Sequence, residues 1–146
     1  ITIADFALEL GSGASSEVRD LAGRIKAGQD VEVSLLSGWL DDWHHPAGED
    51  HNSTHLGDPT HDGEISPVYG GAGMLSTEAM DLLFQLYGEE FDRAWIQAMI
   101  DHHRGAISLA EAAVNDGDNI DVRALAVQEI ATRRIEVDEL IELLTS

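Results

Sequence analysis

The stretch from Phe91 to Val114 constrains the fold more than any other part of the chain, because it carries an uninterrupted helical pattern. Its apolar residues recur at steps of three and four, which is the spacing of an amphipathic helix with one buried face. One apolar stripe includes His102, and the adjoining stripe includes Met99 and His103. We therefore expect a long helix with His102 on its core-facing side and His103 at the border of the same interior.

Two neighbouring histidines in an apolar face indicate either a buried polar network or a metal site. Consecutive helical residues point about 100° apart, so His102 and His103 do not face one point together. Met99, however, can reach His102 at i+3 or His103 at i+4. A thioether beside an imidazole suits a soft or borderline ion, copper above all. The alternative is that Met99 fills the core and that both imidazoles are satisfied by protein groups.

The composition excludes several classes of function. The chain has 28 acidic and 8 basic residues among 146, which argues against nucleic acid or an anionic membrane as a partner. It has no cysteine, so disulfides, zinc–thiolate sites and cysteine nucleophiles are excluded. No run approaches the roughly 20 apolar residues of a membrane span. The length fits a single domain with a substantial core, and the oligomeric state stays open.

Helical periodicity and turn signals predict further helices on both sides of this stretch. The remaining predicted helices cover residues 1–10, 16–43, 77–87 and 120–144, with caps at Ser15 or Ser16, Ser76 and Asn119. A long irregular loop holds all three prolines and connects residues 44 to 75. Its histidines, including His44 and His45, lie among acidic residues and could bind cations weakly, or could simply be solvated.

The two ends of the chain are similar to each other. The segment ITIADFAL at Ile1 aligns with ISLAEAAV at Ile107, and EVRDLA at Glu17 aligns with DVRALA at Asp121. We therefore expect one repeat half at 1–43, truncated at its N-terminus, and a second half at 76–146. We expect an all-α, antiparallel four-helix bundle built from two duplicated hairpins, plus one short extra helix.

The repeat makes two predictions about the metal site. Equivalents of His102 and His103 would fall before Ile1, so we expect a second histidine pair upstream in the natural chain. Two such pairs would approach each other from facing helices, as metal ligands do in bundle cores. Glu32 and Glu136 occupy equivalent positions and could point inwards as hydrogen-bond acceptors for the histidines. Exposed helix carboxylates are the alternative for both.

Nearly the whole chain resembles a known bacterial family. The segments FDRAWIQAMIDHHRGAISLAEAA, DVRALAVQEI and IEVDELIELL, with IADFAL, VRDLAGRI and WLDDW in the first half, resemble the DUF305 family. The resemblance implies a ferritin-like four-helix bundle, export to the periplasm or the cell exterior, and copper binding in some members. It assigns the metal-site hallmark to Met99, His102 and His103, and a methionine-rich segment to Met74 and Met80.

This chain departs from the family pattern at three positions. Leu109 and Leu140 stand where members often have methionine, and Arg133 replaces the usual glutamine. We expect an exported protein that binds or stores copper through Met and His side chains. A non-catalytic structural or interaction bundle is the alternative, and a weak metal-dependent enzyme is the third. Glu-x-x-His, HExxH and G-x-S-x-G motifs are absent, which excludes the di-iron, zinc-protease and serine-hydrolase sites that depend on them.

Overall fold

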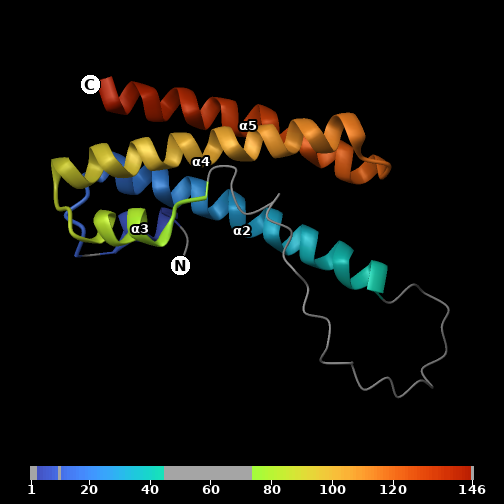
Figure 1. Cartoon of the computed structure of the whole chain (residues 1–146), viewed down its shortest axis with the longest axis horizontal. Coiled ribbons are helices and arrows are strands. Elements are labelled where there is room, and N and C mark those ends of the chain that lie inside the picture. The colour runs from blue at the N-terminus through green and yellow to red at the C-terminus, as the bar shows by residue number, and fades with distance from the viewer. Residues whose placement is uncertain (1–2, 10, 45–73, 146) are drawn as a thin grey trace, which may run out of the picture.

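A computed structural model describes residues 3–9, 11–44 and 74–145 of the chain. These residues form an all-α bundle, as the sequence predicts (Figure 1). None of the helices in the described segments is long and apolar enough to cross a membrane. The helices are α1 (Ile3–Leu8), α2 (Ser16–His44), α3 (Thr77–Phe84), α4 (Glu89–Asp116) and α5 (Ile120–Thr145).

The helices begin at the predicted capping residues. The Ser15 hydroxyl accepts a hydrogen bond from the backbone N–H of Val18 at 3.3 Å, and the Ser76 hydroxyl caps α3 in the same way. The side-chain oxygen of Asn119 accepts two backbone N–H groups in the first turn of α5. Each cap satisfies donors that the first turn of a helix leaves without an intrahelical partner. Two predicted helices are shorter than expected, because α1 ends at Leu8 and α3 ends at Phe84.

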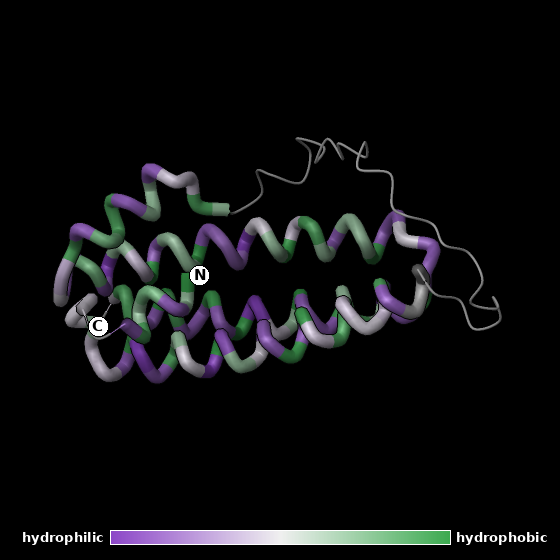
Figure 2. Tube along the Cα trace, turned by 90° about the horizontal axis from the view of Figure 1, so that it is seen from below, coloured by the Kyte–Doolittle hydropathy of each residue, from purple (hydrophilic) through white to green (hydrophobic). Residues whose placement is uncertain are grey.

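The helices α4 and α5 form an antiparallel hairpin, and α2 begins beside it and diverges from it towards His44 (Figure 1). The short helix α1 packs against both α2 and α4, while α3 packs against α4. The α2–α5 contact includes an ion pair between Arg24 and Glu139, with 2.8 Å between nitrogen and oxygen. All five helices therefore contribute to one body, and hydrophobic and hydrophilic residues alternate along each of them (Figure 2).

The core is concentrated at the end of the bundle where α1 lies. Trp95 of α4 is fully buried there, and its indole N–H donates to the Ile3 carbonyl at 2.8 Å. The Asp92 carboxylate accepts the backbone N–H of Ser15, which ties the start of α2 to α4. These two bonds join segments that are far apart in the sequence. The apolar core around them comprises Ala4, Phe6, Ala7, Ala14, Val18, Leu21, Ala22, Ile25, Leu83, Phe91, Trp95, Ile96, Met99, Ile100, Val137 and Leu140.

The structure corrects the expected order of burial of the two histidines. His103 is fully buried, whereas His102 is only half-buried. The buried edge of α4 runs through Phe91, Trp95, Met99 and His103 at steps of four, because α1 and α5 both pack near this side. The stripe that contains His102 therefore lies at the margin of the core.

A second correction concerns the far half of α2. The helical spacing of Val33, Leu36 and Leu40 indicates that the apolar stripe continues through this half, but these side chains are 62%, 42% and 50% exposed. Figure 1 shows the reason, since this half of α2 diverges from the α4–α5 hairpin.

Candidate metal site

A cavity of about 510 Å³ lies where all five helices meet. His102 of α4, Met80 of α3 and Met74, which precedes α3, line it together. The sequence separates these three side chains, and only the packing of α3 beside α4 brings them to one cavity. The remaining wall comes from α1, α2 and α5, with Asp30, Glu32 and Arg133 as its charged members.

His103 lies behind this cavity, in the core. Its Nε2 lies 2.7 Å from the Oε2 atom of Glu136 on α5. The tautomer with its proton on Nε2 donates to that carboxylate, which leaves Nδ1 as an acceptor. Nδ1 is buried and has no hydrogen-bond partner among the described residues. Such a buried lone pair is a potential metal donor, and Met99 lies one turn away on the same buried edge.

The predicted metal residues on α4 therefore divide into two groups. The ring centroids of His102 and His103 are 6.0 Å apart, with an angle of 60° between the rings. His102 faces the cavity, while Met99 and His103 are fully buried in the core. The cavity instead adds Met74 and Met80 to His102.

Arg133 forms a buried ionic cluster beside the cavity. Its Nη2 atom lies 2.5 Å from Glu32 Oε2 and 3.1 Å from Glu129 Oε2, and its Nη1 atom lies 3.7 Å from Glu136 Oε2. Glu136 also pairs with His103, so the cluster connects α2, α4 and α5. We call Glu32, Glu129, Glu136, Arg133 and His103 the interior cluster.

Glu129 is the electrostatically strained member of the interior cluster. Burial, a hydrogen bond with Glu32 and the negative charges of Glu32 and Glu136 raise the pKa of Glu129 from 4.5 to about 7. Arg133 opposes this rise but does not cancel it. Three carboxylates share one guanidinium, so a proton on Glu129 relieves the excess negative charge.

The two repeat-related glutamates have different partners. Glu136 pairs with a histidine, whereas Glu32 pairs with Arg133. His44 is the last residue of α2, but its side chain lies outside the described part of the structure, as does His45. The histidine pair expected upstream of Ile1 lies outside it too.

Sequence reasoning missed the role of Glu129 and treated Arg133 only as a departure from a family pattern. The spacing held a signal, because Glu129, Arg133 and Glu136 are separated by four and three residues and so share one helix face. What the spacing could not indicate is that this polar face turns towards α2.

The donor set around the cavity favours a soft ion. Among the residues that the structure describes, no group of three or more His, Asp or Glu side chains has the arrangement of a metal site. Methionine is not one of those residue types, and Met74 and Met80 supply two thioethers beside His102. Thioether and imidazole together suit Cu(I) better than they suit hard divalent cations.

The comparisons with known proteins agree with this fold. Residues 1–144 match the model of a family described as a domain of unknown function, DUF305. No curated protein matches the sequence. The chain is similar to the crystal structure of a DUF305 protein from Streptomyces coelicolor, described as a candidate secreted protein. The TM-score is 0.76 at 23% identity, over 98% of this chain and 81% of that one, and this likeness shows the fold alone. Because the family model spans almost the whole sequence, the chain belongs to the DUF305 family.

Proposed function

We propose that this protein binds copper as Cu(I) at the cavity lined by His102, Met74 and Met80, in a binding or storage role without turnover. The observation that supports this most directly is the meeting of two thioethers and one imidazole from separate segments at one cavity. Thiolates are the commonest soft ligands, but this chain has none, so thioethers are its only soft donors.

The residues fit the ion in two further respects. Met74 is 66% exposed, so it can move onto an ion without leaving a packed position. Methionine side chains are flexible and polarisable, which suits a site that closes around its ligand. Met99 and the unpartnered Nδ1 of His103 form a second, buried pair of predicted donors. Copper that binds only the folded state would raise the free energy of unfolding of the bundle.

We further propose that the protein acts outside the cytoplasm, as a secreted, periplasmic or cell-surface protein. The related DUF305 protein from Streptomyces coelicolor is described as a candidate secreted protein. A net charge of −20 also suits a protein that meets free cations, because it raises their local concentration.

A structural or interaction bundle is the competing function. It is favoured by the pairing of His103 with Glu136, since a histidine satisfied by a carboxylate can serve the fold alone. Met99 is also fully buried, as a core filler would be.

Competition against a chromogenic Cu(I) chelator under reducing conditions separates the two functions. We expect stoichiometric binding by the wild type, weakened about tenfold or more in Met80→Leu and in His102→Ala. Ser108→Ala is the matched control, because Ser108 is exposed on α4 and bonds only to the backbone of its own helix. Met99→Leu and His103→Ala then decide whether the buried pair contributes. Unchanged affinity in both cavity variants would overturn the proposed site.

A further inference from the structure

Arg133 provides one positive charge that three interior carboxylates share. Glu32 approaches it from α2, and Glu129 and Glu136 approach it from α5, at nitrogen–oxygen distances between 2.5 and 3.7 Å. The guanidinium side chain is only 10% exposed. A guanidinium stays protonated in proteins, so it provides a permanent positive charge at this point.

The groups around Arg133 are typical ligands of hard and borderline cations. Carboxylate oxygens suit Mn(II), and carboxylates with an imidazole suit Zn(II) and Co(II). The interior cluster contains three carboxylates, and Glu136 also contacts the His103 imidazole at 2.7 Å. Without a positive charge among them, these partly buried carboxylates would repel one another strongly. Arg133 meets that need without a metal.

This has a direct consequence for the cavity, because Glu32 and Arg133 both line it beside His102. A Glu32 carboxylate free of Arg133 would add an oxygen ligand to the cavity wall. Arg133 holds Glu32, and Lys26 pairs with Asp30, the other carboxylate of the wall, at 3.5 Å. The thioethers and the imidazole are the soft and borderline donors of the wall. We propose that Arg133 is a specificity-determining residue, a built-in cation that keeps hard and borderline divalent metals out of the interior carboxylates and leaves the cavity to Cu(I). The selectivity for Cu(I) rests on the proposed function, whereas the exclusion of other cations stands by itself.

Removing the guanidinium tests the assignment. Arg133→Gln keeps a polar side chain of moderate length but leaves the three carboxylates without their cation. We expect this variant to bind one Mn(II) or Co(II) ion about tenfold or more tightly than the wild type does. Mn(II) or Co(II) should also raise its melting temperature, because an ion that binds only the folded state stabilises it.

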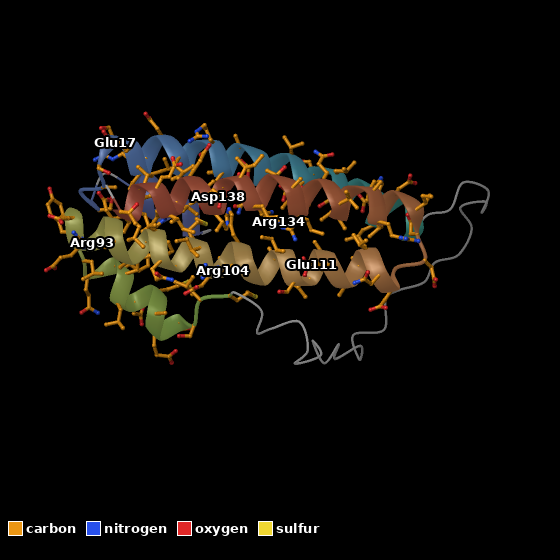
Figure 3. The ribbon with its side chains drawn as sticks, turned by 90° about the horizontal axis from the view of Figure 1, so that it is seen from above. Glu17, Arg93, Arg104, Glu111, Arg134 and Asp138 are labelled. Atoms are coloured by element: carbon orange, nitrogen blue, oxygen red, sulfur yellow. The ribbon has the colours of Figure 1, made fainter. Side chains whose placement is uncertain are left out.

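Arg134→Gln is the matched control. Arg134 is the next residue of α5, but it is 64% exposed and pairs across the surface with Glu111 of α4 at 3.0 Å (Figure 3). It removes the same charge from the same helix without opening the interior cluster. Equal gains of Mn(II) and Co(II) affinity in both variants would show a net-charge effect and would overturn the proposal, as would no gain in Arg133→Gln.

A purely structural Arg133 predicts a different result, namely lower stability with no new metal affinity. If far-UV circular dichroism shows that Arg133→Gln has lost its helices, Glu129→Gln/Arg133→Gln removes one negative charge together with the cation. The double variant should still gain Mn(II) and Co(II) binding through Glu32, Glu136 and His103, and the absence of any gain there overturns the proposal. Cu(I) binding by the wild type is measured separately. Its absence would overturn the proposed function, while the gain of Mn(II) or Co(II) binding would still support the role of Arg133 as a built-in cation.

Discussion

The raised pKa of Glu129 makes the stability of the bundle depend on pH in a defined direction. The pKa is about 7 in the folded protein, against 4.5 for an unperturbed glutamate. Between these values the folded state holds a proton that the unfolded state has lost, so folding becomes less favourable as pH rises through this window. Above about pH 7 Glu129 is ionised in both the folded and the unfolded state, and its partly buried charge lowers the free energy of unfolding by the full amount.

The size of the effect follows from the shift. A shift from 4.5 to about 7 corresponds in full to about 3 kcal/mol. Because the Glu129 side chain is 15% exposed, water still screens part of its charge, and we expect about 1–2 kcal/mol. Glu129→Gln, which is neutral at every pH, should therefore be more stable than the wild type by that amount at about pH 8 and nearly equal to it at about pH 5.

Urea unfolding followed by circular dichroism at several pH values measures this difference. Glu142→Gln is the control, because Glu142 is exposed on the same helix and the substitution removes the same charge. The difference in the free energy of unfolding between Glu142→Gln and the wild type should change little with pH. If Glu129→Gln stabilises the protein equally at both ends of the pH range, or not at all, the electrostatic account of the interior cluster is wrong.

Three further substitutions test the packing. Gly13→Ala should destabilise the protein by about 1–2 kcal/mol, because Gly13 has a φ of +64° and its new methyl group would meet the Tyr87 ring. Gly23→Ala, in the helical interior of α2 with open space around it, should instead stabilise the protein by about 0.5–1 kcal/mol. Thermal unfolding should therefore show a lower melting temperature for Gly13→Ala and a higher one for Gly23→Ala, and changes in the same direction would contradict this reasoning. Trp95→Phe removes the hydrogen bond to the Ile3 carbonyl from a fully buried site and should cost about 1–3 kcal/mol. Hydrogen exchange should then show faster opening of α1, and unchanged protection there would refute the anchoring role of Trp95.

The helices were predictable because their signals are local. The caps at Ser76 and Asn119 are serine and asparagine placed directly before apolar repeats, and the structure confirms both. The choice between His102 and His103 as the buried histidine was not local. Both lie on apolar stripes of α4, and only the positions of α1 and α5 decide which stripe becomes the core.

The candidate site was predictable in its residue types but not in its grouping. The sequence placed Met99 beside the histidine pair, whereas the folded chain brings Met74 and Met80 to His102. That contact depends on how α3 folds back against α4, and no periodicity within either helix specifies it. Glu32 and Glu136 were predicted as possible inward-pointing acceptors, and Glu136 does pair with His103, but the parts of Glu129 and Arg133 were missed for the same reason. Three glutamates and an arginine on helices resemble an ordinary solvated face until α2 and α5 are placed together.

The charge of the chain and the position of Arg133 have complementary consequences for metal selectivity. The 28 acidic residues outnumber the 8 basic ones, and an acidic surface attracts every cation, with little discrimination and with sensitivity to salt. Discrimination therefore has to arise where water is largely excluded and the ligands are fixed. Basic residues in surface ion pairs, such as Arg93 and Arg134, hold carboxylates that are already solvated. Arg133 instead holds carboxylates that line the interior, where an open oxygen ligand would matter most. One buried arginine can thus decide which of the cations gathered at the surface finds ligands inside.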